Sequence, residues 1–380
     1  RKSPRLHKTV SFAAPINTAS ARHKSSNTLT ANTDELPPAL KLPDTTISDP
    51  QTFHEALNRP DSASWLAAIQ EELTAHAARK TWKISILPAG RKAITCKWLF
   101  KTKIGPGPYD ERKKARLVIK GFQQKEGIDY NETFAPTVRL SSIRSVLSFA
   151  AANSWKIHQA DVNTAFLYAT LTEEIYMQLP EGIYLIKDTD CHPSPSQIHE
   201  AKLQSRPVVA QLLRALYGLK QAPREWYKEL TRILQQLGFT PCYNDPGVYT
   251  RYLQSIIDCI LLVYVDDVLI LSPNQDTVDQ FNKEFGEHVQ IKDLQQCKQI
   301  LGIQVDYSNK GITLSQPTLL QQLLHNTGMA NAAPVSCPMQ QHYYQSRNGY
   351  YKVASASEGR RNQMRQDARL IACNNADAMP

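Results

Sequence analysis

Several features that define other classes of protein are missing from this sequence of 380 residues. Its seven cysteines are an odd number, and no two of them form a Cys-x-x-Cys pair. A disulfide framework and a zinc site are therefore not expected, and a reducing compartment fits best. The sequence also has no run of about 18 uncharged apolar residues, so a membrane-spanning helix and a membrane partner are not expected. Its most apolar stretch, 256–271, contains three aspartates.

A signal-peptide pattern is likewise missing, and the sequence begins with Arg1. We therefore expect a fragment of a longer translation product that is located in the cytoplasm. The composition is ordinary for a globular protein, with 42% hydrophobic and 21% charged residues, and the length allows two or three domains. The formal net charge of +9 suits a polyanionic partner such as nucleic acid, although a solvated basic surface would give the same value.

The two ends of the chain are expected to be disordered. Residues 1–52 are rich in Ser, Thr, Asn, Pro and basic residues, and residues 340–380 are also polar. Neither end has the periodic apolar positions whose burial would offset the entropy lost on ordering. The sequence therefore predicts a folded region over 53–339 between two disordered tails.

Within that region, apolar spacing predicts both helices and strands. Asp61 or Ser62 is expected to cap a helix that has Trp65, Ile69 and Leu73 on one face, and Ser141 or Ser142 is expected to cap the next helix. Further helices are expected to follow Pro223 and to cover 276–287 and 317–324. Strands are expected over 94–103, 116–119, 156–162, 256–264 and 268–271. The first two strands should form a hairpin across a Gly-Pro turn at 105–108, and the polar segment 185–207 is expected to be a surface insertion.

Three aspartates in two places carry the chemistry. Asp161 lies at the end of the expected strand 156–162, and Asp266 and Asp267 lie between two apolar strands. Adjacent carboxylates at a tight turn repel each other and resist desolvation, and a bound cation offsets that cost. Two Mg²⁺ ions about 3.5–4 Å apart are the arrangement that phosphoryl transfer uses. The alternative is an ordinary solvated turn.

An ordered series of motifs accompanies these aspartates. It comprises Lys-Ala-Arg-Leu-Val-Ile-Lys-Gly-Phe at 114–122, Gly-Ile-Asp-Tyr at 127–130, Thr-Phe-Ala-Pro at 133–136, Asp-Val-Asn-Thr-Ala-Phe-Leu at 161–167, Glu-Ile-Tyr-Met at 174–177, Pro-Glu-Gly at 180–182, Leu-Tyr-Gly-Leu-Lys-Gln-Ala-Pro-Arg at 216–224, Trp-Tyr at 226–227, Tyr-Val-Asp-Asp at 264–267 and Leu-Gly-Ile at 301–303. In this order and spacing the motifs closely resemble the reverse transcriptase of copia-type retrotransposons, from about residue 53 to Met339.

The resemblance implies an α+β fold of the right-hand polymerase kind, with fingers and a palm whose antiparallel sheet is backed by helices. It implies DNA synthesis on a primed RNA or DNA template from deoxynucleoside triphosphates, within a virus-like particle in the cytoplasm. Asp161 and Asp266 match the metal-bridging aspartates, and Asp267 matches a supporting ligand. The implied cofactor is a pair of Mg²⁺ ions, with Mn²⁺ as a substitute.

The same resemblance assigns nucleotide contacts. Phe166 matches an aromatic steric gate whose ring collides with a ribose 2′-hydroxyl, and core packing is the alternative. Arg116 matches a finger strand that holds the incoming triphosphate, and Lys103 is a second candidate across the expected hairpin. Lys220 and Gln221 match a loop that packs against template and nucleotide.

The remaining match is to the primer grip, a turn formed by Leu301 and Gly302. Ala169 stands where the family usually has Gly, and the 185–207 insertion precedes the Lys220 loop, but neither departure touches a metal ligand. The activity is left open because the residues after Met339 match neither a connection nor a ribonuclease H region. No integrase segment is visible at the front either. An inactive remnant that only binds nucleic acid is therefore the alternative to an active polymerase.

Overall fold

The computed structural model of the chain describes residues 11–12, 48–104, 111–186, 191–309 and 311–332. The chain divides into two compact units, one formed by Glu35–Gln296 and a smaller one formed by Arg1–Asp34 with Cys297–Pro380. Of the expected disordered tails, only 11–12 and 48–52 fall among the described residues. The expected Gly-Pro turn at 105–108 lies outside them.

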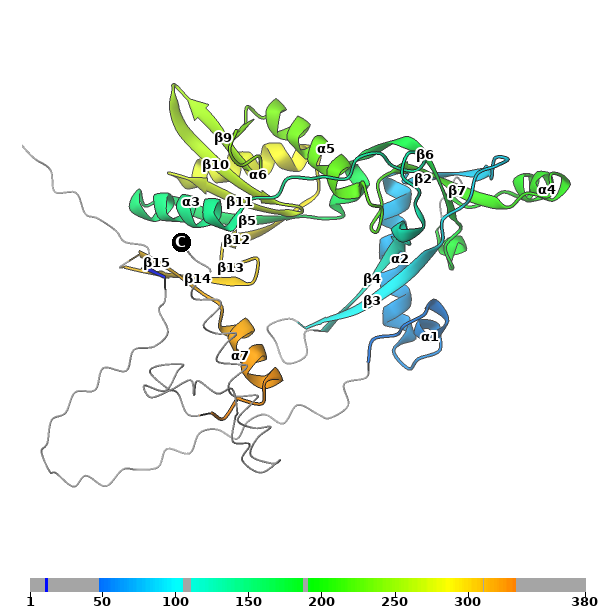
Figure 1. Ribbon diagram of the computed structural model, residues 1–380, viewed down its shortest axis with the longest axis horizontal. Helices are drawn as coiled ribbons and strands as arrows, with labels where there is room; N and C mark the ends of the chain where they lie inside the picture. Colours follow the sequence, from blue (N-terminus) through cyan, green and yellow to red (C-terminus); the bar gives the residue numbers. More distant parts are fainter. Residues whose placement is uncertain (1–10, 13–47, 105–110, 187–190, 310, 333–380) are drawn as a thin grey trace, which may run out of the picture. The chain divides into compact units, whose positions relative to one another are not determined.

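Antiparallel sheets organise the larger unit. Its strands are β2 (Trp82–Ile86), β3 (Cys96–Ile104), β4 (Glu111–Ile119), β5 (Lys156–Val162), β6 (Thr170–Gln178), β7 (Val208–Arg214), β8 (Thr240–Pro241), β9 (Val248–Leu253), β10 (Ile256–Tyr264), β11 (Asp267–Ser272) and β12 (Ile291–Gln296). They form a six-stranded sheet in the order β12-β5-β11-β10-β9-β8, a three-stranded sheet β2-β7-β6, and the hairpin β3-β4 (Figure 1). The strands expected over 156–162 and 256–264 are confirmed residue for residue.

Helices cover these sheets. They are α1 (Phe53–Leu57), α2 (Ser62–Ala78), α3 (Leu140–Ala152), α4 (Pro195–Leu203), α5 (Ala222–Gln236) and α6 (Gln275–His288), with short 3₁₀ turns η1 (Gly121–Gln123), η2 (Ala165–Tyr168) and η3 (Ile183–Leu185). In the central strand β11, Val268 joins the same core cluster as Phe281 of α6. Leu269, on the opposite face of that strand, is also fully buried. The six-stranded sheet is thus covered on both faces at its centre.

Helix α2 packs along the hairpin β3–β4, as Figure 1 shows. Its expected apolar face is confirmed, because Trp65, Ile69 and Leu73 are fully buried. The expected cap is confirmed only in position. Asp61 is the N-cap residue, but its carboxylate accepts the indole N–H of Trp65 (3.1 Å) instead of a helix backbone N–H.

The expected serine cap of the next helix is wrong. Helix α3 begins at Leu140, its N-cap residue is Arg139, and no side chain caps it. The reason is a long-range partner, Asp245, whose carboxylate accepts the backbone N–H of Arg139 (3.0 Å) and a hydrogen bond from the side chain of Ser142. The N-terminus of α3 is therefore held by the loop before β9 and not by its own serines.

The smaller unit contains β1 (Ser11–Phe12), β13 (Gln299–Ile300), β14 (Ile303–Ser308), β15 (Gly311–Ser315) and α7 (Pro317–Asn326). Its sheet has the order β1-β15-β14-β13, with β1 parallel to β15. Helix α7 has no buried residue among those described. The helices and the mainly antiparallel sheets of the two units agree with the expected α+β class.

Candidate active site

Strand register brings the carboxylates together at one end of the six-stranded sheet. Asp161 of β5 lies directly opposite Asp267 of β11, so their side chains project from the same face. Asp266 lies in the two-residue tip between the paired residues Tyr264 and Asp267. The backbone N–H of Val162 donates to the carbonyl oxygen of Asp266 (2.9 Å) and ties this tip to the end of β5. The structure thus brings the three predicted aspartates into one place.

The row of opposed residues continues into β12. Lys292 of β12 is the partner of Asp161 on its other side, so a lysine, two aspartates and Tyr264 line one face of four neighbouring strands. Sequence reasoning did not identify Lys292. The pattern of 291–296 is too polar for the strand itself to be expected, and without the strand there is no register from which to place the lysine.

Burial and like charge perturb two of the carboxyl groups. Burial raises the pKa of Asp266, and the nearby Asp161 raises it further, against opposing effects of Arg116 and Lys114. Burial also raises the pKa of Asp267, and Asp266 adds to this, although Gln159 donates a hydrogen bond to its Oδ1 (3.1 Å). A half-buried carboxyl cluster of this kind is stabilised by any cation that binds it.

Strand β4 supplies cations. Its alternate residues Ala115, Leu117 and Ile119 are buried on the side of α2, so Lys114 and Arg116 project from the other face. Both cations act electrostatically on Asp266. Burial lowers the pKa of Lys114, as do the charges of Arg116 and Lys103. The sequence analysis identified Arg116 and missed Lys114. Lys114 lies two residues before Arg116 on an alternating strand, so its place on the same face could have been predicted.

Arg116 also connects the strand to an aromatic pair. Its guanidinium carbon lies 4.7 Å from the ring centroid of Tyr217, and this ring contacts Phe166 edge-on with centroids 4.8 Å apart. Burial raises the pKa of Tyr217 to about 12, and the charges of Asp266 and Asp161 also raise it. Phe166 is only partly buried. The predicted steric-gate residue and the predicted triphosphate-binding arginine therefore belong to the same cluster as the carboxylates.

The loop after Tyr217 approaches β4 closely through its backbone. Gly218 has φ +95°, and a Cβ atom there would lie 2.1 Å from the carbonyl oxygen of Ile119. A Cβ atom at Gly121 would lie 2.0 Å from the carbonyl oxygen of Gly218. Only glycine fits at either position, so the close contact between the two backbones depends on this pair.

The two polar residues of this loop differ in exposure. Lys220 is exposed, and its Nζ donates to the hydroxyl of Tyr130 (3.0 Å). Gln221 is 1% exposed; its Nε2 donates to the carbonyl oxygen of Asp129 (2.7 Å), and its Oε1 accepts from Gln124 (2.8 Å). Gln221 therefore fixes the loop internally, whereas Lys220 remains accessible to a ligand.

The remaining predicted residues are Lys103 in the larger unit and the Leu301–Gly302 turn in the smaller unit. Lys103 is exposed and lies opposite Arg112 in the register of the β3–β4 hairpin. Leu301 and Gly302 form the two-residue turn between β13 and β14 in the smaller unit, with φ of +48° and +78°. This pair of positive φ values is typical of a tight hairpin turn.

The carboxylates have the chemistry for Mg²⁺ but are not arranged as a closed cage. Among the described residues, no group of three His, Cys, Asp or Glu side chains is already placed to hold one ion. Gln159 donates a hydrogen bond to only one oxygen of Asp267, so all three carboxylates have an oxygen that could bind a cation. Mg²⁺ is commonly held by one or two carboxylates together with water and substrate phosphates, and the residues present fit that mode of binding.

In the described part of the chain, no helix is long and apolar enough to cross a membrane.

Comparisons with known proteins identify the family of the chain. A profile of the family described as "Reverse transcriptase (RNA-dependent DNA polymerase)" matches residues 79–341. The chain is 36% identical over 296 residues to the "Retrovirus-related Pol polyprotein from transposon TNT 1-94" of Nicotiana tabacum, which covers 77% of this chain and 21% of the relative. It is 37% identical over 299 residues to the corresponding polyprotein of transposon RE1 from Arabidopsis thaliana, covering 77% and 19%. The transposon RE2 polyprotein of the same plant is 35% identical over 337 residues, covering 87% and 21%. The chain spans about a fifth of the length of these relatives.

Proposed function

Because the chain belongs to the reverse transcriptase (RNA-dependent DNA polymerase) family, we propose that it synthesises DNA on primed RNA and DNA templates. Membership confirms the resemblance to copia-type retrotransposon enzymes that its motifs carried. One observation supports the proposed chemistry most directly. Asp161 and Asp267 are opposed on one sheet face, with Asp266 beside them, and the charges of Lys114 and Arg116 act on Asp266.

The proposed fold is a right hand. The six-stranded sheet with α3, α5 and α6 corresponds to the palm, and the hairpin β3–β4 with α2 corresponds to the fingers. In this arrangement the palm contributes the acidic residues and the fingers contribute the cationic ones. Such a division suits a reaction between a primer hydroxyl and a polyanionic nucleotide, because catalysis of phosphoryl transfer depends mainly on positioning and charge stabilisation.

The aspartates and the cations would have different roles in nucleotidyl transfer. Asp161 and Asp266, supported by Asp267, would hold two Mg²⁺ or Mn²⁺ ions, which supply charge neutralisation and a more acidic primer hydroxyl. Arg116 and Lys114 would contact the triphosphate, because a guanidinium fork and an ammonium group both suit phosphate oxygens. A bond would form between the primer 3′-oxygen and the α-phosphorus, and the bond from that phosphorus to the β-phosphate oxygen would break. Pyrophosphate would leave, and the hydroxyl proton would pass to water.

Two aromatic residues would select the sugar. The edge-on contact with Tyr217 orients the ring of Phe166, and the exposed part of that ring would meet the 2′ position of a bound nucleotide. A hydroxyl group at that position would collide with it. The guanidinium of Arg116 over the Tyr217 ring would couple the triphosphate contact to the same aromatic pair.

Primer extension tests the proposal. The chain should extend a DNA primer on RNA and on DNA templates with Mg²⁺, and a chelator should stop the reaction. Binding of primer–template should weaken linearly in log affinity as log salt concentration rises, because the net charge of +9 favours phosphate contacts. Salt-dependent binding without any extension would instead establish the inactive remnant as the correct reading. A chain that neither binds primer–template nor extends the primer would contradict both proposals.

A further inference from the structure

A strained residue stands at the tip of the β10–β11 hairpin, next to a catalytic carboxylate. Val265 has φ +57°, in the left-handed region that β-branched residues almost never occupy. Such a conformation is strained and persists only where the surroundings enforce it. Asp266 follows immediately, so the orientation of its carboxylate depends on the conformation of Val265.

A buried indole bonds to this tip. Trp226 of α5 is 1% exposed, and its Nε1–H donates to the carbonyl oxygen of Val265 at 2.7 Å. The bond joins residues 39 positions apart in the sequence, on a helix and at a hairpin tip. A buried indole N–H requires a partner, and the carbonyl of Val265 is its partner in this structure. The bond therefore favours the backbone conformation that places this carbonyl toward α5.

Trp226 is itself held in place from the other side. Its ring packs against Tyr168 of η2, with centroids 6.1 Å apart. The Tyr168 hydroxyl accepts the backbone N–H of Gln290 (2.5 Å) and a hydrogen bond from the guanidinium of Arg79. Because η2 also carries Phe166, the indole lies between the turn with the steric-gate residue and the tip with the carboxylate.

We propose that Trp226 is a positioning residue that holds Val265 in its left-handed conformation and thereby orients Asp266 toward Asp161. This inference rests on the proposed polymerase function for its catalytic consequence. Its structural claim, that the indole N–H maintains the tip, stands independently. Trp226 touches no substrate in this scheme and acts through the backbone of Val265.

The chain offers a matched control for removing the indole N–H. Trp82 is 3% exposed, and its Nε1–H also donates to a backbone carbonyl, that of Cys191, at 3.1 Å. Trp226→Phe and Trp82→Phe thus each remove one buried indole–carbonyl bond and keep an aromatic ring. The two variants should lose similar thermal stability. Only Trp226→Phe should affect the β10–β11 tip.

Two readouts separate positioning from general destabilisation. In hydrogen–deuterium exchange, the peptide covering 262–268 should exchange faster in Trp226→Phe than in Trp82→Phe or wild type. In primer extension, Trp226→Phe should lower kcat about tenfold or more, with KM for the nucleotide changed less than about twofold, because only the orientation of Asp266 is altered. Trp82→Phe should keep the wild-type kcat.

A rescue experiment sharpens the test. Asparagine tolerates positive φ far better than valine, so Val265→Asn added to Trp226→Phe should recover part of the lost kcat and slow the exchange of 262–268. The isostere benzothienylalanine at position 226 replaces the indole N–H with sulfur at nearly constant shape. This variant should show the same loss of kcat and the same faster exchange at the tip. It keeps the proposal testable if Trp226→Phe does not fold.

The outcomes are distinct. Equal tip exchange and equal kcat in Trp226→Phe and Trp82→Phe would overturn the proposal, as would a benzothienylalanine variant with the wild-type kcat and tip exchange. If wild type itself does not extend a primer, the proposed function fails. The exchange of 262–268 then still decides whether Trp226 holds the tip.

Discussion

The acidic and cationic halves of the candidate site are built in different ways. Asp161 and Asp267 lie on β5 and β11, and each of these strands is paired on both sides within the six-stranded sheet. Lys114 and Arg116 lie on β4, whose one strand partner among the described residues is β3. The acidic half is therefore fixed by backbone ladders whose register permits one arrangement. The position of the cationic half depends on contacts that residues outside the two-stranded hairpin make with it.

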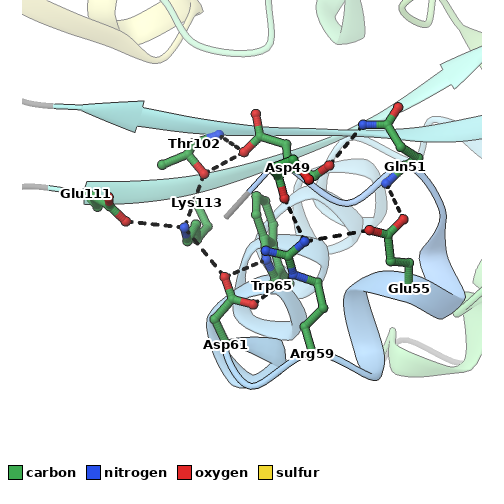
Figure 2. A network of polar contacts seen from close by, with 10 residues as sticks. Asp49, Gln51, Glu55, Arg59, Asp61, Trp65, Thr102, Glu111 and Lys113 are labelled. Carbon is green, nitrogen blue, oxygen red and sulfur yellow. Dashed lines mark hydrogen bonds and ion pairs between the residues drawn. The ribbon is translucent and has the colours of Figure 1, made fainter. Parts of the chain in front are cut away.

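Side chains provide these contacts. Figure 2 shows the carboxylate of Asp49 accepting from both the backbone N–H and the hydroxyl of Thr102, at 2.9 and 2.6 Å. Lys113 donates to the same hydroxyl (3.2 Å) and pairs with Asp61 at 3.6 Å. Further along the strand, Glu72 of α2 accepts the backbone N–H of Leu117 (3.1 Å). We call Asp49, Asp61 and Glu72 the hairpin clasp.

This difference determines what a substitution changes in each half of the site. A backbone ladder tolerates the loss of a single side chain, so substitution of an acidic residue removes chemistry without moving its neighbours. The hairpin clasp consists of individual contacts, so the loss of one carboxylate shifts the strand and changes the geometry of both cations. Substitutions in the two halves should therefore differ in kind, and not only in size.

The largest effect is expected in the acidic half. Asp161→Asn and Asp266→Asn should each lower primer extension by at least about a thousandfold, because each removes a carboxylate that would hold the Mg²⁺ ions at the reacting phosphate. Asp267→Asn should be milder, since Gln159 already holds that carboxylate. The measurement is single-turnover extension together with circular dichroism.

Asp258→Asn is the matched control. Asp258 lies on β10, the strand that leads to the tip, but its carboxylate forms an ion pair with Arg251 (2.9 Å). This variant should extend primers normally. Near-normal activity of Asp161→Asn would exclude the metal assignment, and a lost fold in that variant would contradict the claim that backbone ladders hold Asp161 and Asp267.

The next effect concerns sugar choice. Phe166→Val or Phe166→Ala should admit ribonucleotides, raising the ratio of ribo- to deoxynucleotide incorporation by roughly a hundredfold. Competition between the two nucleotides in primer extension measures it. Tyr217→Phe keeps the ring that contacts Phe166 and serves as the control. Unchanged selectivity in Phe166→Ala would leave Phe166 as a packing residue only.

The strands of the acidic half could be predicted from the sequence because their pattern is local. Apolar runs predicted β5 and β10 residue for residue, and a hairpin with a two-residue tip leaves little freedom of register. That Asp161 joins this hairpin was expected only from the family resemblance, and the register of β5 and β11 shows it. Lys292 was missed because the polar strand β12 has no apolar pattern, so its pairing with Asp161 is visible only in the structure.

Long-range side-chain contacts could not be predicted. The bonds of Asp49 to Thr102 and of Trp226 to Val265 join residues 53 and 39 positions apart, and nothing in either local pattern indicates them. The serine cap of α3 was wrongly expected for the same reason, since its partner Asp245 is about a hundred residues away. Local propensity cannot reveal a competing acceptor from another part of the chain.

A smaller effect should come from the hairpin clasp. Asp49→Ala removes both bonds to Thr102 and the ion pair with Lys101 (3.4 Å), and Lys101 is the strand partner of Lys114. We expect KM for the nucleotide to rise about three- to tenfold with kcat nearly unchanged, as for the loss of about 1 kcal/mol of hydrogen bonding. Steady-state extension measures both constants.

Glu111→Ala provides the control for that experiment. Glu111 is exposed and pairs with Lys113 at 3.3 Å on the same hairpin, but it does not contact Thr102. It should leave both constants unchanged. A drop in kcat without a rise in KM for Asp49→Ala would contradict a clasp that acts only on the cationic half.

The smallest effect is on stability without metal. Burial and the charge of Asp161 raise the pKa of Asp266 above its ordinary value of 3.8, so its ionised form is less stable in the folded than in the unfolded chain. A raised folded-state pKa contributes stability that is present at low pH and is lost as pH rises through that pKa. In a chelator at neutral pH, Asp266→Asn should therefore have a slightly higher midpoint of thermal unfolding than wild type, although it is inactive.

The pH dependence and a metal titration test the cause of that difference. The advantage of Asp266→Asn should shrink as pH falls from about 7 toward about 4, because the wild-type carboxyl then also becomes neutral. Added Mg²⁺ should stabilise wild type more than the variant, because binding to the folded state raises its stability. Asp258→Asn, which breaks an ion pair, should show no such gain at neutral pH. A destabilised Asp266→Asn in the chelator would mean that the carboxylate has a favourable partner within the protein, and the acidic half would not then need a cation to offset its charge.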